Sequence, residues 1–389
     1  MEIANHTLWS LLAILVLGLV LPEMLRKFRL PFITLIILAG AIFGPSGLNY
    51  VSSSESLSFI GFFGMAFLML LTGIETDLRE LKKNNKKIAV MALINGFIPF
   101  LVGVTIIGLF GYPWLTRILV GIVFISSSAA IIMPSLKEHK RINNKVAQLI
   151  LSSVVATDII SLVALGFIFQ SIAKTSSLPL PLHFTIIFMA IFALFYFIPK
   201  VSGYAIFRKF FKDEGHERQL RFVVIVLIGV LAFFSLLGVH PILASFLCGL
   251  ALSSIIKKDH ENILYSKLHT LGYGFFVPVF FFIVGMEMDL SQLKNLDINN
   301  ILMMSLIFGL IVSKTFSGYW SGRLVKLSKT DSLIFGSVSI IKLTTTLAVT
   351  FVAATLGIFD SVIVTSVILL SVITTILGPL LTSYFARKL

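Results

Sequence analysis

The chain has 389 residues, of which 57% are hydrophobic and only 13% are charged. Soluble globular domains carry roughly 25% charged residues, so this composition excludes a soluble or disordered protein and indicates a chain that lies in a lipid bilayer. The net charge of +13 has two explanations, nucleic-acid binding and membrane topology, and the positions of the basic residues decide between them.

Apolar stretches recur along the whole chain. About 20 apolar residues are needed to cross the roughly 30 Å of hydrocarbon in a bilayer. Candidate spans cover residues 7–25, 31–49, 57–75, 88–111, 115–136, 146–172, 183–206, 219–237, 241–256, 268–288, 300–322, 332–357 and 361–386. We therefore predict an all-α polytopic membrane protein with 13 transmembrane helices.

Basic residues alternate between the loops that join these spans. Loops that hold Lys and Arg stay in the cytoplasm, and the even-numbered loops here hold only Arg117, Lys174 and Lys294. The alternation explains the surplus positive charge by topology and excludes nucleic acid as a partner. It predicts a multi-pass protein of the cytoplasmic membrane with its amino terminus outside and its carboxyl terminus in the cytoplasm.

The ends of the sequence and its one cysteine add three expectations. The residues before the first span lack the basic region of a cleavable signal peptide, so we expect this span to be kept. Only two residues follow Arg387, so we expect no soluble regulatory domain after the last span. Cys248 is the single cysteine, which excludes an internal disulfide and a thiol metal cluster, and no cofactor is predicted.

An internal repeat relates the two halves of the chain. Residues 73–82 and 285–294 are identical at six of ten positions at an offset of 212, and each segment closes an aromatic-rich span. At nearly the same offset, residues 126–128 match residues 344–346, and residues 155–159 match residues 372–376. Because the odd span seven lies between the matching halves, we predict two inverted-topology six-helix repeats joined by a linker helix, an arrangement typical of secondary transporters.

Three ionisable residues fall inside the predicted spans: Asp158, Lys314 and Lys342. A charge at the bilayer centre costs at least about 2.5 kcal/mol, so such residues are functional candidates by default. A structural ion pair between Asp158 and one lysine is the alternative. Two lysines and one carboxylate leave an imbalance that a purely structural pair does not need, which favours a functional role.

Two spans carry runs of hydroxyl groups at their centres. These runs are Ser126, Ser127 and Ser128 in span five, and Thr344, Thr345 and Thr346 in span twelve. We predict that both spans are discontinuous crossing helices, whose freed carbonyls and hydroxyls line a cation path, with Lys342 compensating the negative carboxyl end of a half-helix. The alternative is that each hydroxyl only hydrogen-bonds to its own helix.

A single carboxylate facing an aqueous cavity can bind either a proton or a monovalent cation. Competition of the two ions for Asp158 is the minimum machinery for antiport. We therefore predict exchange of a monovalent cation for protons at this residue, with the choice between Na⁺, Li⁺ and K⁺ left open, and no enzymatic activity.

Several short motifs extend along essentially the full chain. They are Leu30-Pro31 with Gly44-Pro45, residues 71–78, residues 124–130 with residues 136–138, Asp158, residues 243–253, and residues 275–281 with Gly285. With these motifs the chain resembles the bacterial sodium/proton antiporters of the second cation:proton antiporter family (CPA2).

The resemblance implies a fold, an assembly and roles for particular residues. It implies a homodimer with a dimerisation domain from residues 1–76 and 218–299, a linker at 183–217, and a moving core from 77–182 and 300–389. It also implies elevator-like alternating access, with Asp158 as the ion-binding aspartate, Thr157 beside it, and Lys314 as the lysine of span eleven.

The sequence departs from this family's pattern at two places. Many members carry two adjacent acids where this chain has Thr157-Asp158, and many carry Arg-Gly-Glu where it has Lys342-Leu343-Thr344. With one intramembrane acid, we expect electroneutral one-for-one exchange. If Lys314 also gave up a proton when the cation binds, exchange would be electrogenic instead.

Other classes of function remain as alternatives. A sodium-coupled symporter of a small organic anion would use Lys314 or Lys342 to bind the anion. A channel is disfavoured by a lone carboxylate at the bilayer centre. An intramembrane protease would need paired aspartates, a Ser/His pair or a zinc-binding helix, and all seven histidines fall at span ends or in loops.

Overall fold

The computed structural model describes residues 2–25, 30–76, 85–137, 142–172, 185–186, 188–196, 216–253, 255–256, 263–293 and 298–388. Within these ranges the chain is helical and contains no strand, as predicted. The first half comprises α1 (Glu2–Met24), α2 (Phe32–Phe43), α3 (Glu55–Glu75), α5 (Asn85–Leu109), α6 (Trp114–Ile125), α7 (Ala129–Lys137) and α8 (Asn144–Ile172). The second half comprises α11 (His216–Leu236), α12 (Pro241–Leu252), α13 (Ile263–Leu271), the π-helix η2 (Gly272–Phe276), α14 (Val277–Met286), the 3₁₀-helix η3 (Leu290–Leu293), α15 (Ile298–Leu324), α16 (Lys329–Ser339), α17 (Thr344–Thr355) and α18 (Ser361–Ala386).

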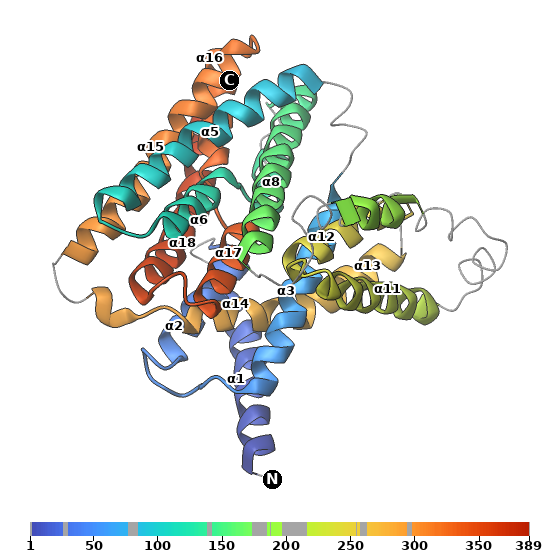
Figure 1. Cartoon of the computed structure of the whole chain (residues 1–389). Helices are drawn as coiled ribbons and strands as arrows, with labels where there is room; N and C mark the ends of the chain where they lie inside the picture. Colours follow the sequence, from blue (N-terminus) through green and yellow to red (C-terminus); the bar gives the residue numbers. More distant parts are fainter. Residues whose placement is uncertain are drawn as a thin grey trace. The chain divides into compact units, whose positions relative to one another are not determined.

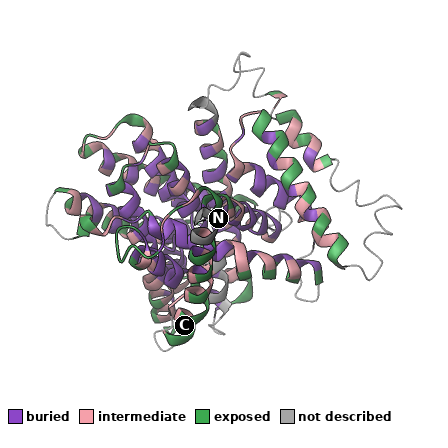
Figure 2. Cartoon of the chain, turned by 90° about the horizontal axis from the view of Figure 1, so that it is seen from below, coloured by how far each residue is buried: buried purple, intermediate pink, exposed green. Residues whose placement is uncertain are grey.

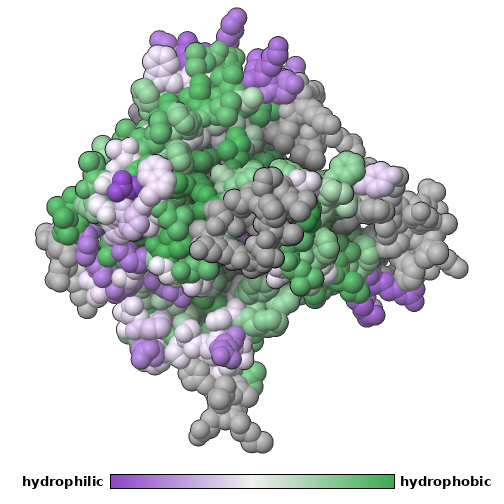
Figure 3. Space-filling view, viewed as in Figure 1, coloured by the Kyte–Doolittle hydropathy of each residue, from purple (hydrophilic) through white to green (hydrophobic). Residues whose placement is uncertain are grey.

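These helices match the predicted spans closely. In the described part of the chain, nine helices or helix pairs are long and apolar enough to cross a membrane, and α2, α6 and α12 are shorter apolar helices. Predicted spans five and twelve are each split into two helices, α6 with α7 and α16 with α17. Predicted span seven and most of the basic loops lie largely outside the described residues. On the face seen in Figure 3, hydrophobic side chains cover broad areas between smaller hydrophilic groups, as expected for a multi-pass membrane protein.

The chain forms two compact units. Unit one contains Met1–Phe59, Leu78–Ser161 and Pro278–Leu389, and unit two contains Ile60–Asp77 and Leu162–Val277. In unit one, α5 packs against α6 and α15, and α16 packs against α15 and α18 (Figure 1). The dimerisation and core domains implied by the family resemblance concern which parts move together, and that division stays a prediction.

Glycines allow two close helix crossings, one in each unit. In unit one, α2 crosses α14 at Gly40 and Gly285, and a Cβ atom on either would lie 2.0–2.1 Å from a carbonyl oxygen of the other helix. In unit two, α3 crosses α12 at Gly73 and Gly249, where the corresponding distances are 2.1–2.3 Å. The sequence repeat aligns Gly73 with Gly285, so matching glycines make similar crossings. This similarity supports the predicted repeat.

Burial differs strongly between the helices of unit one (Figure 2). In the most apolar part of the α16–α17 segment, 94% of the residues are buried inside the protein, compared with 11% in the segment Thr7–Met24 of α1. The buried segment is nevertheless rich in polar side chains, including Ser339, Lys342 and Thr345. Polar groups at membrane depth need partners within the protein, so their hydrogen bonds identify the site around which this unit is built.

Candidate ion-binding site

Both predicted discontinuous helices are present. Helix α6 ends at Ile125 and α7 begins at Ala129, so residues 126–128 form a first break. Helix α16 ends at Ser339 and α17 begins at Thr344, so residues 340–343 form a second break. The three serines therefore occupy the first break itself, whereas the three threonines form the first turn of α17.

The two breaks contact each other directly. The backbone N–H of Ser128 donates to the carbonyl of Ile341 at 2.9 Å, and the Ser127 hydroxyl donates to the carbonyl of Ser339 at 2.8 Å. The hydroxyls of Ser126 and Thr346 are 2.9 Å apart. Backbone groups that the interrupted helices leave open are thus satisfied across the crossing, as unwound segments at membrane depth require.

Asp158 lies beside the first break. It is near the middle of α8 and only 3% exposed, and its carboxylate accepts a hydrogen bond from the backbone N–H of Ser127 at 3.2 Å. Ser127 lies just before the amino end of α7, where the helix dipole and unpaired N–H groups favour a negative charge. The sequence-predicted acid and the sequence-predicted break therefore meet at one point.

Both lysines lie at the other side of the same break. The Lys342 ammonium donates to the carbonyl of Phe124 at 2.9 Å and also to the carbonyl of Ser126. The Lys314 ammonium donates to the carbonyl of Ile125 at 2.6 Å. These carbonyls end α6, and a helix carboxyl end carries a partial negative charge. Two amino groups that can carry a positive charge thus lie where the first half-helix is most negative.

Neither lysine forms a direct pair with the acid. Among the hydrogen bonds and ion pairs of the residues that the structure describes, none joins Asp158 to Lys314 or Lys342. Both ammonium groups nevertheless lie close enough to act on the Asp158 carboxylate through their charge. The arrangement therefore differs from the structural ion pair that was the alternative explanation of these residues.

Two buried hydroxyls near the crossing are not satisfied. Ser128 Oγ and Thr345 Oγ1 have no hydrogen-bond partner, and Thr345 is close enough to Asp158 to interact with it. The Thr157 hydroxyl, in contrast, donates to the carbonyl of Val154 in its own helix at 2.7 Å. An unpartnered buried hydroxyl costs about 1–3 kcal/mol, so Ser128 and Thr345 are the better candidates for a bound ion.

One residue of this cluster was not predicted from the sequence. Asn95 lies in α5, is 1% exposed, and accepts a hydrogen bond from the Lys314 ammonium at 3.1 Å. The signal that could have found it is an amide flanked by Ile94 and Gly96 within an apolar stretch. An uncharged polar residue attracts less attention there than an aspartate or a lysine.

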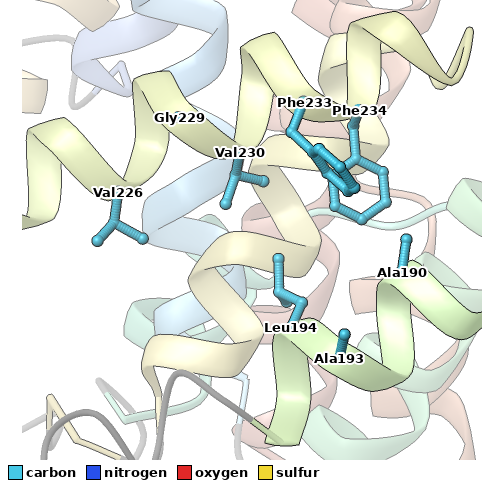
Figure 4. A pocket seen from close by; sticks show the side chains of 8 residues that line it. All are labelled: Ala190, Ala193, Leu194, Val226, Gly229, Val230, Phe233 and Phe234. Carbon is cyan, nitrogen blue, oxygen red and sulfur yellow. The ribbon is translucent and has the colours of Figure 1, made fainter.

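A groove in the other unit is of a different kind. It lies in unit two, between the helical stretch 188–196 and α11, and has a volume of about 340 Å³. Figure 4 shows side chains from both helices that line it, among them Ala190, Leu194, Val230, Phe233 and Phe234. All of these side chains are apolar, so the groove offers no ligand for an ion.

Similarity to known proteins agrees with this geometry. The chain is 29% identical to the probable Na⁺/H⁺ antiporter 3 of Methanocaldococcus jannaschii over 94% of its own length and 93% of that protein. It is 26% identical to the Na⁺/H⁺ antiporter of Enterococcus hirae over 93% of its own length and 94% of that protein.

A solved structure shares the whole fold. The sodium proton antiporter MjNhaP1 of Methanocaldococcus jannaschii at pH 8 aligns with a TM-score of 0.77 at 20% identity, covering 100% of this chain and 99% of that one. Residues 11–388 match the family described as sodium/hydrogen exchanger, transmembrane. The chain therefore belongs to the transmembrane sodium/hydrogen exchanger family, a family of transporters rather than enzymes.

Proposed function

We propose that the protein exchanges Na⁺ for protons across the cytoplasmic membrane, with both ions competing for Asp158. The observation that carries this proposal is a buried carboxylate at a helix break, bound by the N–H of Ser127 and by neither lysine in the described structure. Such a group can release a proton when a cation takes its place. The names of the two relatives, both Na⁺/H⁺ antiporters, support sodium as the first cation to test.

Hydroxyl and carbonyl oxygens complete the proposed cation site. Alkali cations prefer oxygen ligands, and Ser128 Oγ and Thr345 Oγ1 have no other partner. One carboxylate with neutral oxygens suits a monovalent ion. Thr157 stays a predicted member of this site through its position next to Asp158, although its hydroxyl is engaged with its own helix.

The lysines have a supporting role in this proposal. Each ammonium is held by carbonyl oxygens at the end of α6, so we propose that they balance the half-helix and favour the charged form of Asp158. A small organic anion, which a sodium-coupled symporter would carry, would have to displace these bonds. The symporter alternative is therefore less well supported than exchange of cations.

The movement and the assembly are carried over from the family resemblance. We propose a homodimer in which residues 77–182 and 300–389 move as the core against residues 1–76 and 218–299, with 183–217 as the linker. The amino terminus would lie outside and the carboxyl terminus in the cytoplasm. With Asp158 as the one acid, the core carries either a proton or a cation in each crossing, which makes exchange electroneutral.

Proteoliposomes with an internal pH dye test the proposed function. Each of Na⁺, Li⁺ and K⁺ is added in turn, and proton movement out of or into the vesicles is followed. Proton movement that requires one of these cations, and no organic anion, is the expected result. Proton movement that requires an anion would favour symport, and cation flux without proton movement would favour a channel.

The charge balance is tested by recording on a solid-supported membrane. Electroneutral exchange predicts no steady charge displacement when Na⁺ drives transport. A steady displacement that disappears in Lys314→Gln would instead show that the lysine carries a second proton.

A further inference from the structure

Asn95 contacts Lys314 at both ends of the lysine residue. Its side-chain Oδ1 and its backbone carbonyl each accept a hydrogen bond from the Lys314 ammonium at 3.1 Å. Its Nδ2 donates to the backbone carbonyl of Lys314 at 3.2 Å. The lysine side chain is thereby held along its length by one residue of the neighbouring helix α5.

The same amide also contacts two serines, one of which lies in a further helix. Asn95 Nδ2 lies 3.1 Å from the hydroxyl of Ser317 in α15 and 3.2 Å from that of Ser339, the last residue of α16. Gly318 allows α15 and α16 to approach at this point, because a Cβ atom there would lie 2.6 Å from the Cα atom of Gly336. Asn95 therefore fixes the lysine relative to the start of the second break.

The orientation of the amide follows from its neighbours. Oδ1 faces an ammonium group, which can only donate, and Nδ2 faces a carbonyl, which can only accept. In the reversed amide, Nδ2 would face the ammonium and Oδ1 would face the carbonyl, so a donor would face a donor and an acceptor would face an acceptor. The observed orientation is the one that satisfies all of these groups.

The hydrogen-bond acceptors of the Lys314 ammonium are all neutral. They are the carbonyls of Asn95 and Ile125, Asn95 Oδ1, and the Ser127 hydroxyl at 3.2 Å. The charged groups that act on this ammonium are Asp158 from α8 and Lys342 from the second break. An amide binds the ammonium without cancelling its charge, whereas a carboxylate in this place would form an ion pair.

We propose that Asn95 is a positioning residue for transport, which holds the Lys314 ammonium at the carboxyl end of α6 and away from direct contact with Asp158. This inference rests on the proposed role of Asp158. Without the amide, the ammonium loses an acceptor and moves toward the carboxylate. The charged carboxylate is then favoured, so protons compete less with the cation and cation binding extends to lower pH.

A double-mutant cycle tests this role. Purified wild type, Asn95→Ala, Lys314→Gln and the double variant are heated with and without NaCl, and the pH at which Na⁺-dependent stabilisation is half-maximal is determined. Asn95→Ala should move this midpoint down by about one pH unit, the size of effect expected from a closer opposite charge. Lys314→Gln should move it up, and Asn95→Ala should have no further effect once the lysine is absent.

Ser317→Ala is the matched control. It removes one acceptor of the same amide without touching the ammonium, so its midpoint should equal that of wild type. If Asn95→Ala does not fold, Asn95→Leu, which is nearly the same size as the wild-type side chain, is measured in its place with the same expectation.

The results that overturn the proposal are distinct from those that overturn the function. A folded Asn95 variant with the wild-type midpoint, or with a shift that persists in Lys314→Gln, shows that Asn95 has only a structural role. Loss of Na⁺-dependent stabilisation in Asp158→Asn keeps the proposed function in that case. Full stabilisation in Asp158→Asn would contradict the proposed function itself.

Discussion

Each of the two breaks separates two half-helices, but the breaks differ in the charged groups that contact them. At the first break, two ammonium groups bind the carboxyl end of α6 and Asp158 lies at the amino side of α7. At the second break, the described contacts are neutral: the carbonyl of Ile341 accepts from Ser128 N–H, and the Lys342 N–H donates to the Thr374 hydroxyl. The side chain of Lys342, which belongs to the second break, extends to the first break.

This difference indicates how a repeat can become asymmetric. Matching segments provide the breaks and the hydroxyls in both halves of the chain. The buried ionisable side chains gather at one break only, because the long Lys342 side chain reaches across the crossing to the carboxyl end of α6. We therefore propose that the ion binds at the first break and that the second break supports it.

Asp158→Asn should have the largest effect. The amide is nearly the same size but cannot exchange a proton, so cation-dependent proton movement in proteoliposomes should be abolished while the protein stays folded. Ser161→Ala, which removes a hydroxyl that donates to the Asp158 backbone carbonyl, should retain transport. Exchange in Asp158→Asn above roughly a tenth of the wild-type rate would show that Asp158 does not bind the exchanged ions.

Lys342→Ala should reduce transport less completely. The change leaves the carbonyls of Phe124 and Ser126 without their charged donor, and a lost bond to a charged group costs about 1.5–3 kcal/mol. We expect a lower melting temperature and a roughly tenfold lower flux, since about 1.4 kcal/mol corresponds to a factor of ten. Thr374→Val, at the neutral break, should lower both less. A Lys342→Ala protein with wild-type stability and flux would show that the lysine is incidental.

Ser128→Ala and Thr345→Val should weaken cation binding without destabilising the protein. Both hydroxyls are buried and make no close hydrogen bond, so without the cation the folded state loses at most the interaction of Thr345 with Asp158. Each lost ligand should raise the apparent KM for Na⁺ about three- to tenfold, measured in proteoliposomes. Ser371→Ala, which removes another unpartnered buried hydroxyl, is the control. An equal effect of all three changes would argue against a specific site at the first break.

His240 should have the smallest effect, because it lies outside both breaks. It precedes α12, and its Nδ1 accepts from the backbone N–H of Ile242. Burial lowers its pKa to about 4, so it stays neutral where an ordinary histidine, with a pKa of about 6.5, becomes charged. The unfolded chain binds this proton first, so stability is complete above about pH 6.5 and falls between that pH and about 4.

His240→Asn should keep the hydrogen bond to the Ile242 N–H, because Asn is a good N-cap residue and carries no charge at either pH. The loss of stability at low pH should therefore disappear, which thermal unfolding at pH 5 and pH 7 measures. The pH dependence of transport should match that of wild type. A shifted transport profile would make His240 a pH sensor and would move part of the pH response away from the first break.

The sequence predicted much of this arrangement for identifiable reasons. Apolar length gave the spans, and hydroxyl runs in Ser126–Ser128 and Thr344–Thr346 indicated both breaks because such runs are unusual in apolar helices. Asp158 was evident because an unpaired charge at membrane depth is costly. Each of these signals is local in the sequence.

Other features depend on contacts that the sequence does not encode locally. Asn95 and Lys314 are separated by 219 positions, and an amide in an apolar helix gives no indication of its partner. The reach of Lys342 to the first break depends on how the half-helices cross. For the same reason, no local pattern distinguished the satisfied hydroxyl of Thr157 from the unpartnered hydroxyl of Thr345.

Proton release on cation binding tests the central claim most directly. Purified protein in weak buffer with a pH dye is mixed with NaCl, and with choline chloride as the control, at pH values where the carboxylate is protonated. Competition at Asp158 predicts that Na⁺ releases about one proton per chain from wild type, that choline releases none, and that Asp158→Asn releases none with either salt. Equal Na⁺-dependent proton release from wild type and Asp158→Asn would contradict the account.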